Sequence, residues 1–343
     1  MDLDAKKVGP VALVTGGAGY LGRHLTTRLL ELGCEVRTFD QTAEGPDPRA
    51  QHFVGDIRDY AALREAARGA SVIFHAAAVI LMVGVARPAT RRRAFDVNVL
   101  GTEHVIRACR ELGIGRLVHT SSANVLLDRP VVEADEEEPY AARFVDLYTE
   151  TKVAAEKLVR AADGEGLRTV SLRPGGIWGF DDGSFMMKAF VEQLVTGRFK
   201  ALIGSGEAVV DNTHVENLVD AQLLAAQALT ERPETVGGRA YHITDDERLN
   251  GLEFFRPLVE AFGERFPTAR IPGGLALAVA HALEWAHFVR GGAEPPLTRG
   301  GVYKLIRTSS LRIDRARRDL GYAPRYSHRD LVRAVPALRA AHS

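Results

Sequence analysis

The chain has 343 residues, and its 44 Lys and Arg balance its 44 Asp and Glu, so the formal net charge is zero. A neutral chain has no global basic field, and we therefore expect no nucleic-acid partner. No run reaches the roughly 20 apolar residues that a membrane-spanning helix needs, and the polar amino terminus lacks the apolar core of a signal peptide.

The two cysteines, Cys34 and Cys109, show neither a disulfide framework nor the spacing of metal ligands. We therefore expect no metal site and a reducing, cytoplasmic location. A short basic run, Arg91 to Arg93, is interpreted as the solvated start of a helix. The acidic run EADEEE, residues 133–138, is interpreted as a solvated loop.

From residue 11 the sequence alternates between short apolar runs and helical patterns. Buried strands of a parallel sheet give such near-continuous apolar runs, and helices connect them. The alternation predicts an α/β fold with a doubly wound parallel sheet and right-handed crossovers. The predicted strands lie in 11–16, 35–40, 51–59, 71–78, 116–122 and 167–179, and the predicted helices in 21–33, 60–69, 95–113 and 146–158.

The first turn after a strand is rich in glycine. TGGAGYLG places Gly16, Gly19 and Gly22 three residues apart, between the strand at 11–16 and the following helix. Glycines in this context allow a tight turn and a close backbone approach to a pyrophosphate, which the helix N-terminus attracts. We predict a dinucleotide at this turn, contacted by Gly16, Gly19, Tyr20, Leu21 and Gly22.

An acidic residue, Asp40, ends the second predicted strand 18 residues after Gly22. A carboxylate there can accept hydrogen bonds from an adenosine ribose and repels a 2′-phosphate. NAD is therefore the expected cofactor, with NADP as the alternative; a plain turn cap is the other interpretation of Asp40. Asp56 and Ile57, where the third strand ends, are expected to flank the adenine.

The second half of the chain is less regular. It contains helical patterns at 184–197 and 214–229 and a strand at 239–244 that we expect to return to the sheet. We therefore predict a dinucleotide-binding core in residues 9–180 with returning segments at about 209–244. A smaller, mostly helical substrate lobe is expected from residues 181–208 and 245–335.

The fourth predicted strand ends in small residues, Ala76, Ala77 and Ala78, which allow a dinucleotide to cross the sheet edge. The next segment, VILMVGV at 79–85, is apolar, although a loop at the mouth of a site is normally polar. This indicates either a buried contact with the second lobe or a lipophilic substrate. The predicted substrate lobe contains a second group of apolar residues, Phe185, Met186, Met187 and Phe190, which also suits a lipophilic substrate. Ordinary core packing is the alternative for each of them.

Three side chains with hydroxyl, phenol and ammonium groups are expected to converge. Ser121 and Ser122 end the fifth strand, at the edge of the sheet where ligands of such folds bind. Tyr148 and Lys152 lie four residues apart, on one face of the next helix. Alone, such a pair is more often an ordinary surface contact than a proton-transfer device.

Taken together, these motifs are recognisable. TGGAGYLG, Asp56, Asn98 in DVNVLGT, TSSANV, YTETK and RPGGIWG resemble an extended short-chain dehydrogenase/reductase, over about 11–331. VVDNTHVENLVDAQLLAAQAL, AYHITDDE and RIDRARRDLGYAP are most similar to the 3β-hydroxysteroid dehydrogenase family, including the sterol-4-carboxylate 3-dehydrogenases.

The resemblance implies a Rossmann-type fold and a catalytic triad of Ser122, Tyr148 and Lys152. Tyr148 is expected to remove the alcohol proton during hydride transfer to NAD. Lys152 and the positive nicotinamide are expected to lower the pKa of Tyr148 from its ordinary value of about 10, while Lys152 binds the nicotinamide ribose. Ser122 orients the substrate oxygen, with Ser121 as a minor competitor. Asn98 has a supporting role, and Pro174, Gly175 and Ile177 lie against the nicotinamide.

The implied substrate is the 3β-hydroxyl of a sterol or steroid, including a 4-carboxysterol that then loses carbon dioxide. Trp178, Asn212, His214 and His242 depart from the family pattern and bear on substrate identity. The alternatives are a β-keto acid or long-chain ketone reductase, a nucleotide-sugar epimerase or reductase, and a dinucleotide-binding regulator without catalysis.

Two contacts with partners are also expected. A homodimer built on the helices at 102–112 and 149–160 is common in the superfamily. The stretch LALAVAHALEWAHFV, residues 275–289, is expected to be a core or lid helix, with a peripheral membrane contact as the alternative.

Overall fold

A seven-stranded parallel sheet forms the centre of the protein. The computed structural model describes residues 3–180, 183–292 and 294–342. The strand order is β11-β7-β5-β4-β1-β2-β3, which confirms the predicted doubly wound sheet. The strands are β1 (Val11–Thr15), β2 (Glu35–Asp40), β3 (Gln51–Val54), β4 (Val72–His75), β5 (Arg116–Thr120), β7 (Arg168–Pro174) and β11 (Arg239–Ile243).

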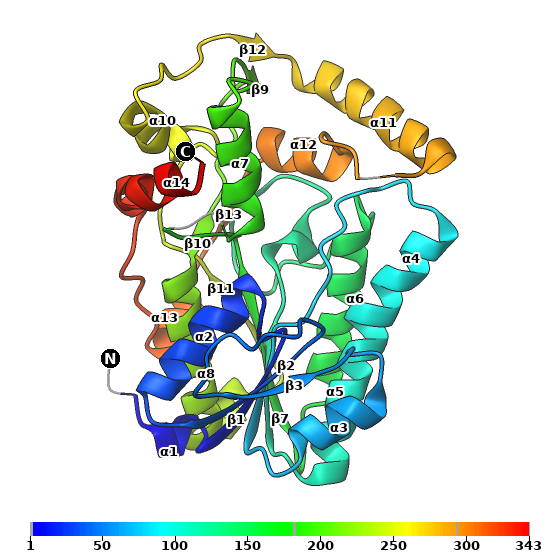
Figure 1. The fold of residues 1–343 in the computed structure, drawn as a ribbon, viewed down its shortest axis with the longest axis vertical. Helices are drawn as coiled ribbons and strands as arrows, with labels where there is room; N and C mark the ends of the chain where they lie inside the picture. The colour runs from blue at the N-terminus through cyan, green and yellow to red at the C-terminus, as the bar shows by residue number, and fades with distance from the viewer. Residues whose placement is uncertain (1–2, 181–182, 293, 343) are drawn as a thin grey trace.

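Side chains of the strands alternate between two apolar cores. In β1, Ala12 and Val14 join a core with the helices on one face, and Leu13 joins the core on the other. Figure 1 shows these helical layers around the sheet. The first face carries α1 (Ala5–Val8), α2 (Tyr20–Glu31), α8 (Val215–Glu231) and α13 (Asp314–Leu320); the second carries α3 (Tyr60–Ala67), α5 (Gly101–Leu112) and α6 (Leu147–Ala161).

Local signals set the ends of the helices that position the site. Asp146 caps α6 by accepting a hydrogen bond from the Thr149 N–H at 2.7 Å. The predicted helix at 95–113 is interrupted, because a wide π-helical turn, Asp96–Leu100, joins α4 (Pro88–Phe95) to α5. Such turns recur at functional sites, and this one carries Asn98.

Beyond β7 the chain enters the small lobe, which here means the elements α7, α10, α11, α12 and α14. Figure 1 shows this lobe at the end of the sheet where β7 continues into β8 (Gly176–Trp178). None of the helices in the described ranges combines the length and the apolar character that crossing a membrane requires. The bounds are α7 (Phe185–Val195), α10 (Arg256–Ala261), α11 (Gly273–Arg290), α12 (Arg299–Ile306) and α14 (Val335–His342).

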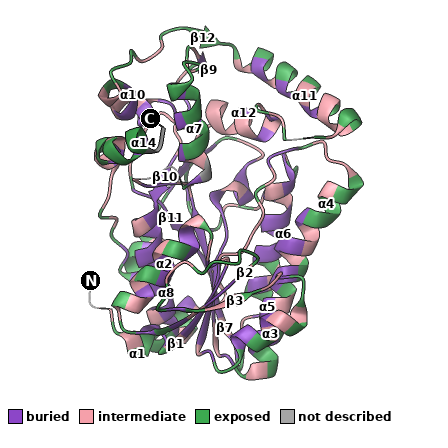
Figure 2. Cartoon of the chain, in the orientation of Figure 1, coloured by how far each residue is buried: buried purple, intermediate pink, exposed green. Residues whose placement is uncertain are grey.

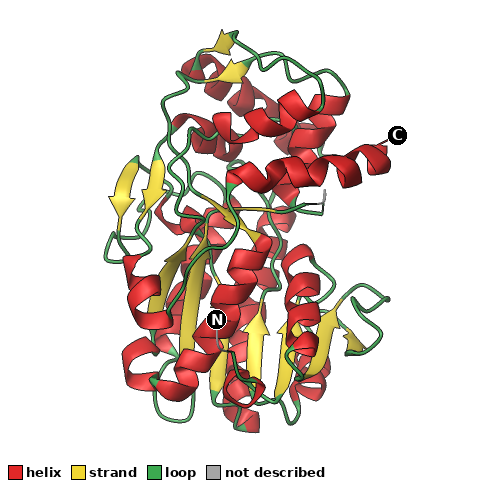
Figure 3. Cartoon of the chain, turned by 90° about the vertical axis from the view of Figure 1, so that its left-hand side faces the viewer, coloured by secondary structure: helices red, strands yellow, loops and turns green. Residues whose placement is uncertain are grey.

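Short parallel strand pairs connect the lobe to the core. β8 pairs with β10 (Asn212–His214), and β6 (Val131–Ala134) pairs with β13 (Ser309–Leu311). A third pair, β9 (Leu202–Ile203) with β12 (Arg270–Ile271), lies at the far end of the lobe from the sheet (Figure 3). α9 (Pro233–Val236) precedes β11. In contrast to the predicted lobe boundary, α13 packs into the core against α8 and β11.

One part of the acidic run is not a solvated loop. Glu136 is buried, accepts a hydrogen bond from the His242 N–H at 3.0 Å and forms an ion pair with Arg315 at 3.3 Å. Burial raises the pKa of its carboxyl group. The expectation was wrong for this residue, because β11 and α13 close over it. Figure 2 shows that the strands of the central sheet are mostly buried, whereas the helices around them carry both buried and exposed residues.

Candidate active site

The glycine turn after β1 forms a cradle of bare backbone. Gly16 has φ +71°, and a Cβ there would lie 2.8 Å from the backbone nitrogen of Ala77. A Cβ on Gly22 would lie 2.1 Å from the carbonyl oxygen of Gly16. Gly19 precedes α2 and makes no side-chain cap, so the first N–H groups of this helix are not capped by it. Such a turn fits a pyrophosphate.

The structure brings Asp40 to this turn. Its Oδ2 accepts a hydrogen bond from the Ala18 N–H at 3.2 Å, and its Oδ1 accepts one from the Thr42 N–H at 3.1 Å. The carboxylate therefore lies at the end of β2, beside the segment that joins β1 to α2. This geometry suits contact with a ribose and disfavours an additional phosphate there.

The other residues predicted to contact the adenine, Asp56 and Ile57, make contacts within the protein itself. Asp56 forms an ion pair with Arg58 at 2.5 Å, and this hydrogen-bonded arginine lowers the pKa of the Asp56 carboxyl. Ile57 is buried, and its side chain lies against Gly101 at the start of α5. Their contact with an adenine stays a prediction.

Asn98 fastens three segments around the site. Its Oδ1 accepts a hydrogen bond from the Val79 N–H at 2.8 Å, and its Nδ2 donates to the Val79 carbonyl at 2.9 Å. The same Nδ2 donates to Thr151 Oγ1 in α6 at 2.9 Å. The buried amide therefore holds the chain after Ala76–Ala78 against the helix that carries Tyr148.

The predicted triad meets at the carboxyl edge of β5. Tyr148 and Lys152 lie one turn apart on α6. Ser122 lies near enough to the Tyr148 phenol to lower its pKa. Ser122 Oγ also accepts a hydrogen bond from the Asn124 N–H at 3.2 Å. Lys152 is buried, and its Nζ donates to the carbonyl oxygen of Thr120 at 2.6 Å.

Burial dominates the pKa values of the pair in the chain without cofactor. It raises the pKa of Tyr148 to about 12, and the neighbouring Ser122 only partly opposes this. Burial also lowers the pKa of Lys152 to about 8. The lowering of the Tyr148 pKa by Lys152 and a bound nicotinamide stays a prediction.

Ser121 is committed to a different network. Its Oγ donates to Glu156 Oε2 at 2.5 Å, and Glu156 also forms a buried ion pair with Arg173 at 2.7 Å. The Tyr140 hydroxyl donates to the same carboxylate at 2.8 Å. This network was missed, although Glu156 follows Lys152 at the same four-residue step as Lys152 follows Tyr148. It leaves Ser122 as the serine that faces the phenol of Tyr148.

The residues at the end of β7 lie where the nicotinamide was expected. The Gly175 N–H donates to Thr213 Oγ1 at 2.8 Å, and a Cβ on Gly175 would lie 2.2 Å from the Asp211 carbonyl oxygen. Pro174 is buried, and Ile177 is partly exposed. These residues join core and lobe; their contact with a nicotinamide stays a prediction.

The mouth loop, residues 79–85, is held by the small lobe. Glu284 of α11 accepts hydrogen bonds from the Gly84 and Val85 N–H groups at 3.3 and 3.2 Å. Glu294 accepts one from the Met82 N–H at 2.9 Å. On its other side the loop binds α6, because the Tyr148 N–H donates to the Leu81 carbonyl at 3.1 Å. Carboxylates 200 residues away carried no sequence signal for this role.

Most of the apolar side chains singled out in α7 are core residues. Met187 and Phe190 are buried with Trp178 and Phe255. Met186 is partly buried, and its Sδ lies 3.0 Å from the position of a Cβ on Gly176. The side chain of Phe185 lies outside the described part of the structure. Core packing, the alternative we stated for these residues, accounts for Met187 and Phe190.

The four departures from the family pattern lie at the lobe junction, all buried. Trp178 Nε1 donates to Asp245 Oδ2 at 2.6 Å, and the His214 N–H also binds this carboxylate, at 2.7 Å. The His214 ring lies 4.5 Å from that of Trp178. Burial lowers the pKa of His214 to about 4. Asn212 and His242 are likewise buried, so the departures shape the junction.

Comparisons with known proteins agree with this geometry. The model of the 3-beta hydroxysteroid dehydrogenase/isomerase family matches residues 13–272. A 3-beta-hydroxysteroid dehydrogenase of Mycolicibacterium neoaurum is 42% identical over 324 residues, which cover 92% of this chain and 87% of that protein. A 4-hydroxy-2-methyl-3-oxo-4-farnesyl-3,4-dihydroquinoline-1-oxide ketoreductase of Stigmatella aurantiaca is 37% identical, covering 96% and 95%.

Among solved structures, a dTDP-glucose 4,6-dehydratase of Streptomyces venezuelae with NAD bound has a TM-score of 0.73 and 25% identity, covering 96% of this chain and 96% of that chain. A UDP-glucose 4-epimerase of Thermotoga maritima, at 21% identity and a TM-score of 0.75, covers 97% of this chain and 100% of its own. The second likeness shows the fold alone.

Proposed function

The chain belongs to the 3-beta hydroxysteroid dehydrogenase/isomerase family, and we propose that it interconverts the 3β-hydroxyl and the 3-ketone of a sterol or steroid with NAD. The observation that supports this most directly is the position of Lys152, which is buried one helical turn from Tyr148 and donates to the carbonyl of Thr120, two residues before Ser122. A phenol, a hydroxyl and an amine in this arrangement suit proton transfer to and from an alcohol.

The cofactor is NAD. The glycine cradle after β1 fits its pyrophosphate, and Asp40 suits its adenosine ribose. Asn98 orders the backbone beside it, and Pro174, Gly175 and Ile177 lie where the strand edge meets the lobe. A bound NAD would supply the acceptor for the hydride of the carbinol carbon, and NADH would supply the hydride in reduction.

The side chains of the site handle the proton and the oxygen. Ser122 Oγ would orient the substrate hydroxyl toward the neighbouring phenol of Tyr148. In oxidation the substrate O–H bond breaks and its proton passes to the Tyr148 phenolate. The Lys152 ammonium favours that phenolate through its positive charge. In reduction Tyr148 returns the proton to the forming alcohol.

The lipophilic character of the substrate rests on the mouth loop. Its side chains between Val79 and Val85 are all apolar, and the loop lies directly against the N-terminus of α6, which carries Tyr148. The direct test is turnover of a 3β-hydroxysteroid, a 4-carboxysterol and a 2-alkyl-3-hydroxy acid with NAD and NADP. Reduction of NAD with a ring alcohol supports the proposal, and turnover of the acyl acid alone contradicts it.

A second candidate is the reduction of a ketone on a long apolar substrate. It is favoured by the Stigmatella relative, whose printed name specifies a ketoreductase acting on a farnesyl compound. The same Ser122, Tyr148 and Lys152 would carry out this reaction. A nucleotide-sugar substrate is disfavoured by the apolar mouth loop, and a regulator without catalysis is disfavoured because Tyr148 and Lys152 are both present.

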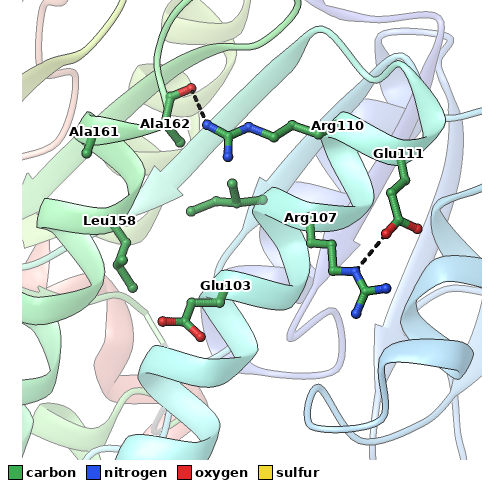
Figure 4. A pocket seen from close by; sticks show the side chains of 8 residues that line it. Glu103, Arg107, Arg110, Glu111, Leu158, Ala161 and Ala162 are labelled. Atoms are coloured by element: carbon green, nitrogen blue, oxygen red, sulfur yellow. Dashed lines mark hydrogen bonds and ion pairs between the residues drawn. The ribbon is translucent and has the colours of Figure 1, made fainter.

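The homodimer predicted on α5 and α6 remains part of the proposal. These helices lie side by side with a hollow of about 380 Å³ between them. Figure 4 shows the hollow, lined by Arg107, Arg110 and Leu158 among others, with Arg107 bound to Glu111 at 2.7 Å. Light scattering of Leu158→Arg should show monomers where the unaltered protein is dimeric. The cytoplasmic location also stays a prediction.

A further inference from the structure

Asn212 presents a free side-chain amide at the lobe junction. The residue is only 8% exposed, yet its amide forms no hydrogen bond or ion pair with any residue in the ranges that the structure describes. Buried polar groups normally have a partner, and each exception needs an explanation. The neighbouring Asp211 Oδ1 also lacks a partner and is shut off from solvent, whereas the amide of Asn212 still borders open space. This amide is therefore accessible to a ligand.

The backbone around Asn212 is fixed on both sides. The carbonyl oxygen of Asn212 accepts a hydrogen bond from the Asp245 N–H at 2.9 Å. The next side chain, Thr213, accepts one from the Gly175 N–H at 2.8 Å through its Oγ1. In the parallel pair of β8 and β10, Asn212 lies opposite Gly176. These contacts hold the amide in one place, as a preorganised binding group requires.

The amide lies on the lobe face of β8, away from the face expected to hold the nicotinamide. Successive residues of an extended segment point to opposite faces, so Gly176 points away from Gly175 and Ile177, two of the residues predicted to contact the nicotinamide. A Cβ on Gly176 would lie 2.6 Å from Asn212 Oδ1 and 3.0 Å from Met186 Sδ. Asn212 and the partly buried Met186 of α7 therefore form a wall on the lobe side of this strand.

The same edge of the sheet carries the proposed triad. In the parallel pair of β5 and β7, Thr120 lies opposite Leu172. Ser122 and Gly176 follow these residues by two and four positions, so both lie just beyond the carboxyl ends of adjacent strands. Ligands of such sheets bind outside these ends. The amide of Asn212 therefore lies beside the space into which a substrate bound at Ser122 would extend.

On the basis of the proposed function, we propose that Asn212 determines substrate specificity, because its amide hydrogen-bonds an oxygen atom of the substrate other than the reacting 3β-hydroxyl. A side-chain amide donates to a ketone or a carboxylate and accepts from a hydroxyl, so the favoured substrates carry such an oxygen substituent. A site built around a hydrogen bond discriminates strongly against an analogue that lacks the matching atom. Met186 and the mouth loop would contact the hydrocarbon part of the substrate.

The test uses the full chain and three 3β-hydroxysteroids: one without another oxygen, one with a 17-ketone and one with a 4-carboxyl group. For each steroid, kcat/KM with NAD and the Kd by calorimetry with NADH present are measured in the unaltered chain and in Asn212→Leu. Leucine has a similar size but no polar atom. We expect the variant to lose at least about tenfold in kcat/KM and in affinity for an oxygenated steroid, and less than about twofold for the plain one. The steroid that loses affinity identifies the position of the bound oxygen.

Met186→Leu is the matched control, because it changes an apolar neighbour and should alter the affinity for all three steroids alike. Asn212→Ala repeats the measurement if thermal unfolding shows that the leucine variant does not fold. Equal effects of the Asn212 substitution on all three steroids, including no effect, would overturn the proposal, as would absence of binding by all three. Selective binding without turnover would support the role of Asn212 and contradict the proposed activity alone, so the two failures are distinguishable.

Discussion

The ammonium of Lys152 lies 2.6 Å from the carbonyl oxygen of Thr120, the last residue of β5. This bond fixes the amine at the edge of the sheet where β5 ends. Ser122 follows two residues after Thr120. The bond also places a buried positive charge one turn from Tyr148. The amine is held by backbone, so its position depends on the sheet and not on another side chain.

Replacing Lys152 should therefore impair catalysis strongly. We expect Lys152→Ala to lower kcat/KM by about 10²–10⁴-fold and to move the rise of the pH–rate profile to higher pH, because the phenolate loses a neighbouring ammonium. Steady-state rates between pH 6 and 10 measure both effects. Lys157→Ala, an exposed lysine on the same helix, is the control and should behave as the unaltered chain. An unchanged pH profile in Lys152→Ala would contradict the assigned role.

Cofactor choice should depend on Asp40. In Asp40→Ser the carboxylate that disfavours a 2′-phosphate is gone, so we expect the ratio of kcat/KM for NAD over NADP to fall by at least about tenfold. Rates with each dinucleotide measure the ratio. Glu44→Ala, an exposed acidic residue shortly after β2, should leave the ratio unchanged. A similar fall in both variants would point to general surface charge.

Acid should destabilise the fold through buried histidines such as His75. Burial and the nearby Lys152 charge lower the pKa of His75 from 6.5 to about 3. Between these values the unfolded chain binds a proton that the folded chain does not, so stability falls as the pH falls. The cost is up to about 1.4 kcal/mol per pH unit.

Urea unfolding of His75→Gln at pH 7 and pH 5 tests this. The variant loses its two threonine contacts, to Thr15 and Thr102, and should be less stable than the unaltered chain at pH 7. The difference in the free energy of unfolding between the variant and the unaltered chain should be smaller at pH 5 than at pH 7. His281→Gln, at the exposed surface, controls for loss of an imidazole. A difference that stays constant would show that His75 is not the acid-sensitive group.

The Glu284 carboxylate should be important for stability as well as for the mouth loop. It is fully buried and binds Arg299, so Glu284→Ala leaves a cation and two loop N–H groups without their partner. We expect the free energy of unfolding to fall by roughly 3–5 kcal/mol. Glu31→Ala, which breaks an exposed pair with Arg28, should cost under about 1 kcal/mol in the same urea titration. Equal losses of unfolding free energy in the two variants would contradict a stabilising role for the buried Glu284–Arg299 pair.

The sheet and the dinucleotide turn could be predicted because their signals are local. Apolar runs of strand length, glycines at a strand end and Asp40 at the next strand end all lie within short stretches of chain. The convergence of Ser122, Tyr148 and Lys152 was expected from the same sheet edge, whereas their catalytic roles were implied by the family resemblance. Helix bounds were predicted to within a few residues, as for α6, which begins at Leu147.

The errors arose where distant segments decide the environment. The acidic run around Glu136 predicts a solvated loop, but β11 and α13 bury this residue. Burial raises the pKa of Tyr148 in the chain without cofactor, and this burial depends on packing that the short motif does not encode. The π-helical turn at Asn98 and the Glu284 contacts depend on packing that no short pattern encodes.

The most direct test of the central claim is Tyr148→Phe. The substitution removes only the phenol oxygen, so NAD should bind with an unchanged Kd by calorimetry, while oxidation of a 3β-hydroxysteroid should fall by about 10³-fold or more. Thermal unfolding confirms that the variant folds. Retention of more than about a tenth of the activity in Tyr148→Phe, with NAD bound normally, would contradict proton transfer by Tyr148.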